Sequence, residues 1–240
     1  MKKLSVLLAL LLAFTNTQAQ ETETEKDVEK PEAYVSAQLI SHYTWRGLDM
    51  GDVSIQPTIG VAYKGFSAEV NGNAGWQEYD PLEFDITLAY SIGGLRLAVT
   101  DYWATPNNEN LPYFNYKSGE TWHTFEGTVG YDFGFLSATW NTNFAGLDGS
   151  NNSSDRAFSS YFELSAPFRF GGCDWQATLG IVPWATSYYL TERFAVTNAS
   201  LRATYTFNLN KRLKLPIFAE LSTSPYHDHA FLIFGVAIGN

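Results

Sequence analysis

The sequence predicts an all-β fold, a transmembrane up-and-down antiparallel β-barrel of about twelve strands with short periplasmic turns and longer outer loops. Three observations predict this fold class. Apolar and polar residues alternate with a period of two along one segment after another. Short and long connections follow each other in strict turn between these segments. Beyond the first residues of the chain, no uninterrupted apolar run is long enough for a membrane-spanning helix.

The first 33 residues precede the alternating pattern. Residues 1–19 resemble a secretory signal peptide, because Lys2 and Lys3 come before the apolar run 4–14 and a small residue, Ala19, stands at the expected cleavage point. Residues 20–33 are acidic and nearly free of aliphatic side chains, which predicts a flexible linker. A plug reaching into the barrel is the alternative for this linker. Residues 34–240 are assigned to the barrel.

The period of two is clear in the stretch 66–77. One face carries Phe66, Ala68, Val70, Ala74 and Trp76, and the other carries Ser67, Glu69, Asn71, Asn73 and Gln77. A helix would mix these residues on both faces, so the pattern indicates a strand. In the stretch 34–46, the same reasoning places Tyr43 and Trp45 on the apolar face and His42 and Arg46 on the polar face.

The connections supply the second signal. Short turns are predicted at 64–65, 93–94, 132–134, 171–172 and 208–212, and longer loops at 47–52, 78–82, 104–121, 146–157, 185–192 and 223–227. An up-and-down barrel with tight turns at one end and long loops at the other produces this order.

The apolar face is predicted to point outward, toward lipid. About twelve strands enclose too wide a space for side chains to fill with an apolar core. The polar face then lines the lumen, with candidate lining residues His42, Arg46, Glu69, Asp85, Arg96, Glu126, Glu163, Arg202, Lys214 and Glu220. Aromatic residues near strand ends are candidates for the girdle at the lipid headgroups: Tyr43, Trp45, Tyr63, Trp76, Tyr90, Tyr131, Trp175 and Tyr205.

Two features fit this pattern poorly. Pro57 and Pro216 fall inside predicted strands, where proline removes a backbone donor, so a bulge is expected near each. Asp101 continues the lipid-facing series of its strand and is therefore expected at the rim or in a loop.

The start of the predicted barrel resembles a family of uncharacterised small bacterial outer-membrane proteins. The resemblance lies in the run Ser41–Gly47 (SHYTWRG), followed by Pro57, Gly60 and Gly65-Phe66. The first hairpin of that family has the pattern S-x-Y-x-[FWY]-R-G, then a polar loop and a strand with proline and glycine. The resemblance implies an outer-membrane, porin-like barrel and no particular substrate. Arg46 is expected to end the first strand on the lumen side as a salt-bridge member or as a constriction residue, and Gly47 to open the first outer loop.

Composition and motifs limit the chemistry. The formal net charge of −10 argues against a nucleic-acid partner, and the single Cys173 excludes an intramolecular disulfide. No catalytic or phosphate-binding motif is found, so neither an enzyme activity nor a cofactor is expected. His227 and His229 are too few for a predicted metal site.

The sequence thus predicts an outer-membrane channel for passive diffusion of small polar solutes, in contact with lipid and inserted by the barrel-insertion machinery. One alternative is a non-conducting structural or adhesion barrel that binds partners through its outer loops, above all the aromatic-rich stretch 102–122. A less favoured alternative is a lipid hydrolase or acyltransferase that uses His42, and the least favoured is a soluble periplasmic binding protein.

Overall fold

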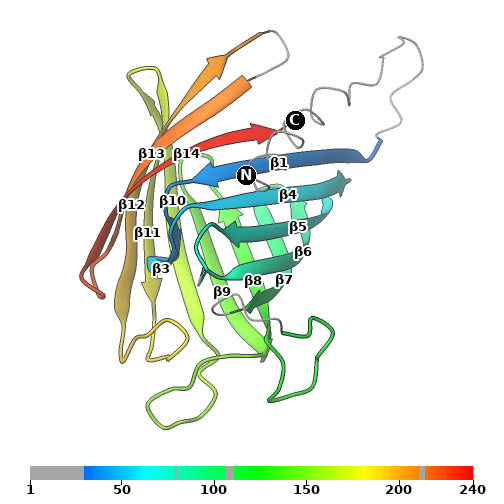
Figure 1. Ribbon diagram of the computed structural model, residues 1–240, viewed down its shortest axis with the longest axis vertical. Helices are drawn as coiled ribbons and strands as arrows, with labels where there is room; N and C mark the ends of the chain where they lie inside the picture. Colours follow the sequence, from blue (N-terminus) through cyan, green and yellow to red (C-terminus); the bar gives the residue numbers. More distant parts are fainter. Residues whose placement is uncertain (1–29, 79, 106–110, 211–213, 240) are drawn as a thin grey trace.

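The chain folds into a closed antiparallel β-barrel (Figure 1). The structure is a computed structural model that describes residues 30–78, 80–105, 111–210 and 214–239. The predicted signal peptide and most of the predicted linker lie outside these residues. No helix within the described ranges is long and apolar enough to cross a membrane.

Twelve strands form the wall, in the circular order β1-β14-β13-β12-β11-β10-β9-β8-β7-β6-β5-β4. The wall strands are β1 (Glu32–Ile40), β4 (Ser54–Tyr63), β5 (Phe66–Gly75), β6 (Leu82–Ile92), β7 (Leu95–Thr105), β8 (His123–Asp132), β9 (Ser137–Gly146), β10 (Ser160–Phe170), β11 (Cys173–Val182), β12 (Ala195–Asn208), β13 (Lys214–Ser224) and β14 (His229–Gly239). Two short strands, β2 (Tyr43–Trp45) and β3 (Leu48–Gly51), pair only with each other. The predicted fold class and strand number are confirmed. Strand β1 begins at Glu32, so the last residues of the predicted linker belong to the wall.

Long and short connections alternate from β1 to β12, but the last loop, 225–228, is as short as a turn, so the predicted strict alternation is wrong at that point. In Figure 1 the long loops after β7, β9 and β11 gather at the lower end of the barrel, opposite the short turn between β10 and β11. Lys64 and Gly65 of the β4–β5 turn both have positive φ angles, 50° and 86°, as tight hairpin turns require.

The outward face of the wall is apolar and exposed. Leu88, Val129 and Leu232 expose 59%, 54% and 62% of their surface, far more than core residues of a soluble domain would. On β6 and β8 the inward neighbours are polar: Thr87, Glu126 and Thr128 lie on the lumen side. This orientation agrees with the predicted direction of the apolar face.

Three inward aromatic rings lie over glycines of neighbouring strands. A Cβ atom at Gly60 would lie 2.3 Å from the Tyr34 ring, and one at Gly235 would lie 2.2 Å from the Phe218 ring. At Gly180, a Cβ would lie 1.9 Å from the Tyr161 hydroxyl. Only glycine leaves room for these rings, so each contact ties two strands together at one position.

The two prolines differ in their surroundings. Pro216 keeps its place in the pairing of β12 with β13, opposite Thr206. Between β4 and β5, the paired positions skip from Ile55↔Ala74 to Thr58↔Asn71, so the pairing is interrupted around Pro57. The missing backbone donor of proline explains this interruption. The register is the same on both sides of Pro57 and is continuous at Pro216, so the bulges expected from the sequence are absent at both prolines.

Asp101 lies within β7 rather than at the rim or in a loop, which corrects the sequence prediction. Its carboxylate lies 2.7 Å from Nδ1 of His123, whose side chain is fully buried. The ring of Tyr116, in the following loop, stacks on the His123 ring with ring centres 4.2 Å apart. The backbone oxygen of Tyr113 lies 2.5 Å from Nε2 of His123. The loop after β7 therefore folds over the outer wall and covers this polar pair.

Candidate functional site

The interior of the barrel is crossed by a hairpin. After β1 the chain bends at Ser41, whose backbone N–H donates to the Phe234 carbonyl at 2.8 Å. The chain then turns inward as β2 and β3, and Arg46 and Gly47 form the tip. Both tip residues have positive φ angles, 53° and 84°. Gly47 therefore sits at the end of an inward hairpin, and the prediction that it opens an outer loop is wrong.

Arg46 forms a two-pronged ion pair with Glu126 of β8. Nη1 lies 2.5 Å from one carboxylate oxygen and Nη2 lies 2.8 Å from the other. The Arg46 side chain is 11% exposed and that of Glu126 only 1% exposed. The hydroxyl of Tyr102 donates to the same carboxylate at 3.1 Å, and Arg46 also donates to the Tyr189 hydroxyl. A buried pair with this many hydrogen bonds holds the hairpin firmly against the far wall.

Gly47 fixes how closely the tip approaches the wall. A Cβ atom at this position would lie 1.6 Å from the backbone oxygen of Thr197 in β12. The positive φ angle of Gly47 is also one that other residues rarely adopt. The two tip residues thus have separate roles. Arg46 supplies the positive charge that pairs with Glu126 of β8, and Gly47 has no side chain and can therefore approach the backbone of β12.

Aromatic rings surround the Arg46 guanidinium. Its central carbon lies 4.5 Å from the Trp45 ring centre and 4.7 Å from that of Tyr161. Trp45 also stacks on Tyr189 at 5.7 Å, and Tyr188 meets both Trp45 and Tyr189 edge-on. We call this group the packed sector; it consists of Trp45, Arg46, Tyr102, Glu126, Tyr161, Tyr188 and Tyr189.

The two tyrosines of the β11–β12 loop remain neutral. Burial raises the pKa of Tyr188 to about 12 and also raises the pKa of Tyr189. Their hydroxyls are therefore protonated at neutral pH, and the charge of Arg46 is balanced by Glu126 rather than by a phenolate.

A second apolar cluster lies inside the barrel near β14. Ile40, Phe218 and Ile233 are buried there, with Tyr43 and Phe231 packed against them. His42 stacks on Phe231 with ring centres 4.6 Å apart. Its two ring nitrogens lie 3.0 Å from Asp49 and 3.4 Å from Asp52. His42 thus lies beside this inner cluster, and its neighbours are carboxylates of the hairpin region.

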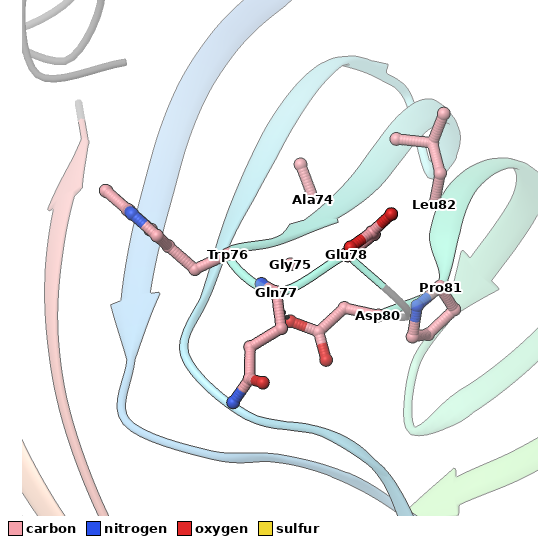
Figure 2. Close-up of a pocket in the computed structure, with 8 residues that line it drawn as sticks. All are labelled: Ala74, Gly75, Trp76, Gln77, Glu78, Asp80, Pro81 and Leu82. Carbon is pink, nitrogen blue, oxygen red and sulfur yellow. Dashed lines mark hydrogen bonds between the residues drawn. The ribbon is translucent and has the colours of Figure 1, made fainter. Parts of the chain in front are cut away.

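The β5–β6 loop supports the base of the hairpin (Figure 2). Figure 2 shows the Asp80 carboxylate turned toward Gln77, whose backbone N–H donates to it at 2.8 Å. The N–H of Asp52, directly after β3, donates to Asp80 at 3.4 Å, and the side chain of Gln77 donates to the Asp52 carboxylate. Residues 74–78 and 80–82 line the pocket shown in Figure 2, and these hydrogen bonds connect it to the base of the hairpin.

The inward face of β4 to β7 is different, and we call it the polar sector. It is lined by Gln56, Thr58, Glu69, Asn71, Asn73, Glu83, Asp85, Thr87 and Thr100. Hydrogen bonds run between neighbouring strands here: Thr58 donates to Asn71 at 2.7 Å, and Thr87 and Thr100 share one at 3.0 Å. Most of these side chains are partly exposed, in contrast to those of the packed sector.

The predicted lining residues occupy three kinds of position. Arg46–Glu126 and Arg202–Glu220 form inward ion pairs, the second at 2.6 Å. Glu69, Asp85 and Glu163 lie on inward positions between the strand ends, and Glu163 accepts from the Tyr161 hydroxyl at 2.9 Å. Arg96 and Lys214 are exposed at the short-turn ends of their strands.

The predicted aromatic girdle needs one correction. Five of the predicted girdle residues lie on the outward face of wall strands, and Trp76 directly follows the end of β5. The five are Tyr63, Tyr90, Tyr131, Trp175 and Tyr205. Tyr43 and Trp45 are inside, so their assignment is wrong. The bend at Ser41 breaks the alternation of β1, and the later residues therefore no longer follow the face of the wall strand.

Several important residues were missed from the sequence. Tyr102 lies in the predicted contact stretch 102–122, but it faces inward and bonds Glu126. Tyr188 and Tyr189 lie in a predicted outer loop with no periodic pattern. The only sequence signal was their aromatic character in a stretch expected to be solvated.

A serine and a histidine lie in contact at the start of the β13–β14 loop. The Ser224 hydroxyl lies 2.7 Å from Nδ1 of His227, and Nε2 of that ring lies 3.1 Å from the Tyr189 carbonyl. The second imidazole nitrogen thus meets a backbone oxygen rather than the carboxylate of a catalytic triad. Among residues 30–78, 80–105, 111–210 and 214–239, no group of three His, Cys, Asp or Glu side chains could hold a metal ion.

Comparison with known proteins gives distant structural likenesses. No family model matches the chain, and no curated protein matches it. The fold is similar to a KdgM porin (7% identity, TM-score 0.46, 86% of this chain and 97% of that chain) and to a NanC porin (10%, 0.42, 87% and 98%). It is also similar to an outer membrane channel from Pseudomonas putida F1 (10%, 0.45, 92% and 99%). The strand topology, rather than these likenesses, defines the fold.

Proposed function

We propose that the protein is an outer-membrane channel through which small polar solutes diffuse. The observation that carries the proposal is the combination of an exposed apolar outer wall and a polar inward face on β4 to β7 in a closed barrel. In lipid, closure satisfies the backbone of every wall strand, and outward leucine and valine meet hydrocarbon at no cost. The inner threonine, asparagine and glutamate side chains meet water.

Other features agree with this location. The predicted signal peptide at 1–19 would export the chain, and the barrel-insertion machinery would then place it in the membrane, with the long loops outward. Tyr63, Tyr90 and Tyr131 stand near the short turns on the outward face, where headgroups would meet aromatic rings. The first-hairpin resemblance to small outer-membrane proteins also supports the proposal.

The hairpin makes the passage narrow. Arg46, Glu126 and Tyr189 fill the packed sector, so solutes pass on the side of the polar sector. Arg46 therefore combines the two expected roles, since it is an ion-pair member that also narrows the lumen. Small solutes rather than large ones fit this arrangement.

Planar bilayer recording tests the channel. The purified, folded protein is expected to give discrete conductance steps that are small for a twelve-strand barrel. Replacement of the tip and strands of the hairpin, residues 43–51, by a short Gly-Ser linker is expected to increase the step size several-fold. A matched control replaces residues 151–155 of the outer β9–β10 loop by the same kind of linker and leaves the steps unchanged.

The alternative is a non-conducting barrel whose outer loops bind partners. The tight packing of the hairpin favours this alternative, since it removes much of the lumen from use. A folded wild-type barrel without conductance, identified by its heat-dependent gel mobility, would overturn the channel proposal in favour of the alternative. Conductance that is unchanged after removal of the hairpin would contradict its role as the constriction.

A further inference from the structure

The charges of the lumen are not balanced where a solute would pass. Away from the short-turn ends of the wall strands, inward carboxylates belong to Glu69, Glu83, Asp85, Glu126, Glu163 and Glu220. Arginine neutralises Glu126 through Arg46 and Glu220 through Arg202. The other four carboxylates form no ion pair within the described residues.

These four carboxylates accept hydrogen bonds from neutral groups. Glu69 accepts from the Tyr34 hydroxyl and the Asn71 amide, both at 2.8 Å. Glu83 accepts from the Tyr43 hydroxyl at 2.9 Å, and Asp85 accepts from the Trp103 backbone N–H. Neutral donors orient a carboxylate but leave its charge uncompensated.

Nearby basic groups compensate only part of this charge. Arg96, at the short-turn end of β7, interacts electrostatically with Tyr34, and Arg46 interacts electrostatically with Glu163 from the packed sector. Glu83 and Asp85, two residues apart on β6, form no ion pair within the described part of the chain. Both are partly exposed on the polar sector and thus in contact with the lumen.

We infer that the lumen prefers small cations over anions, and that Glu83 and Asp85 set this preference. This inference rests on the proposed function, because it names the class of solute that the channel favours. Ionised carboxylates without a counter-charge, in a narrow wet passage with low-dielectric walls, attract cations and repel anions. The packed sector confines the passage to the wall that carries them, so a passing ion cannot avoid their field.

Reversal potentials in a KCl gradient test the inference. The folded wild-type protein, measured at pH 8.5 to keep the carboxylates ionised, is expected to reverse toward the K⁺ equilibrium potential. The double variant Glu83→Gln/Asp85→Asn is expected to move the reversal potential most of the way to zero while single steps persist. The single variant Glu163→Gln provides an independent, smaller shift in the same direction.

A matched control separates local from total charge. Asp155→Asn/Glu192→Gln removes the same two charges from exposed positions of the outer loops and is expected to leave the reversal potential nearly unchanged. A wild-type reversal potential at zero or toward Cl⁻ would overturn the inference while the channel function stands. Equal shifts from the double variant and its control would show that surface charge, not Glu83 and Asp85, sets the selectivity. Absence of any conductance would instead overturn the proposed function itself.

Discussion

The packed sector and the polar sector lie inside the same barrel but are built in different ways. In the packed sector, Arg46 and Glu126 are almost fully buried and each has several partners. In the polar sector, neighbouring strands exchange single hydrogen bonds such as Thr58–Asn71, and water reaches most side chains. The difference teaches that a barrel can close one side of its interior with a rigid insert and leave the other side wet.

The largest effect is expected from Arg46→Ala. Loss of the guanidinium leaves the Glu126 carboxylate buried without its counter-charge, which costs about 3–5 kcal/mol of unfolding free energy. Urea unfolding of the barrel in detergent micelles measures this loss. The double variant Arg46→Ala/Glu126→Ala should recover part of it, because no unpaired charge remains.

Arg169→Ala is the matched control for Arg46→Ala. Arg169 pairs with Asp174 at 2.7 Å beside a short turn, and both side chains are mostly exposed. Its removal should leave the unfolding curve unchanged, because water screens exposed ion pairs. Equal losses from Arg46→Ala and Arg169→Ala would refute the distinction between buried and exposed pairs.

Gly47→Ala is expected to have the next largest effect. The added methyl group would meet the Thr197 carbonyl, and the positive φ angle would be strained, at a cost of about 1–3 kcal/mol. We expect the tip to withdraw from β12 and the single-channel conductance to rise. Gly119→Ala, at a similar φ of 80° with nothing near the added methyl, carries the strain without the clash and should leave conductance unaltered.

Thr58→Val is expected to have the smallest effect. It removes one hydrogen bond of the polar sector, and the freed Asn71 amide can bond water instead, so the loss should stay below about 1 kcal/mol. The same urea titration measures it. A loss as large as that of Arg46→Ala would mean that the polar sector is as tightly built as the packed one.

The sequence predicted the wall but not its contents. Strict alternation and alternating loop lengths determine strand number and orientation, because each strand has one face in lipid and one in water. The inner hairpin does not follow this alternation, because neither of its faces meets lipid and side chains on both faces pack against residues inside the barrel. Tyr43 and Trp45 were therefore assigned to the wrong side.

The partners of Arg46 could not be predicted for a related reason. Glu126, Tyr161 and Tyr189 are 80, 115 and 143 positions away in the chain, and only the closed sheet brings them to one point. The sequence did indicate that Arg46 faces inward. Which inward carboxylate pairs with Arg46 depends on how far the hairpin extends from β1 into the barrel, and no local sequence pattern determines that length.

The rings of Tyr34, Tyr161 and Phe218 over their glycines have a consequence for the size of the pore. The diameter of a closed barrel depends on the number of strands and on the shear, the total stagger between them. Sliding one strand by two residues would press each ring against a side chain instead of a glycine. These three contacts therefore oppose any change of stagger and help to hold the barrel at a single width.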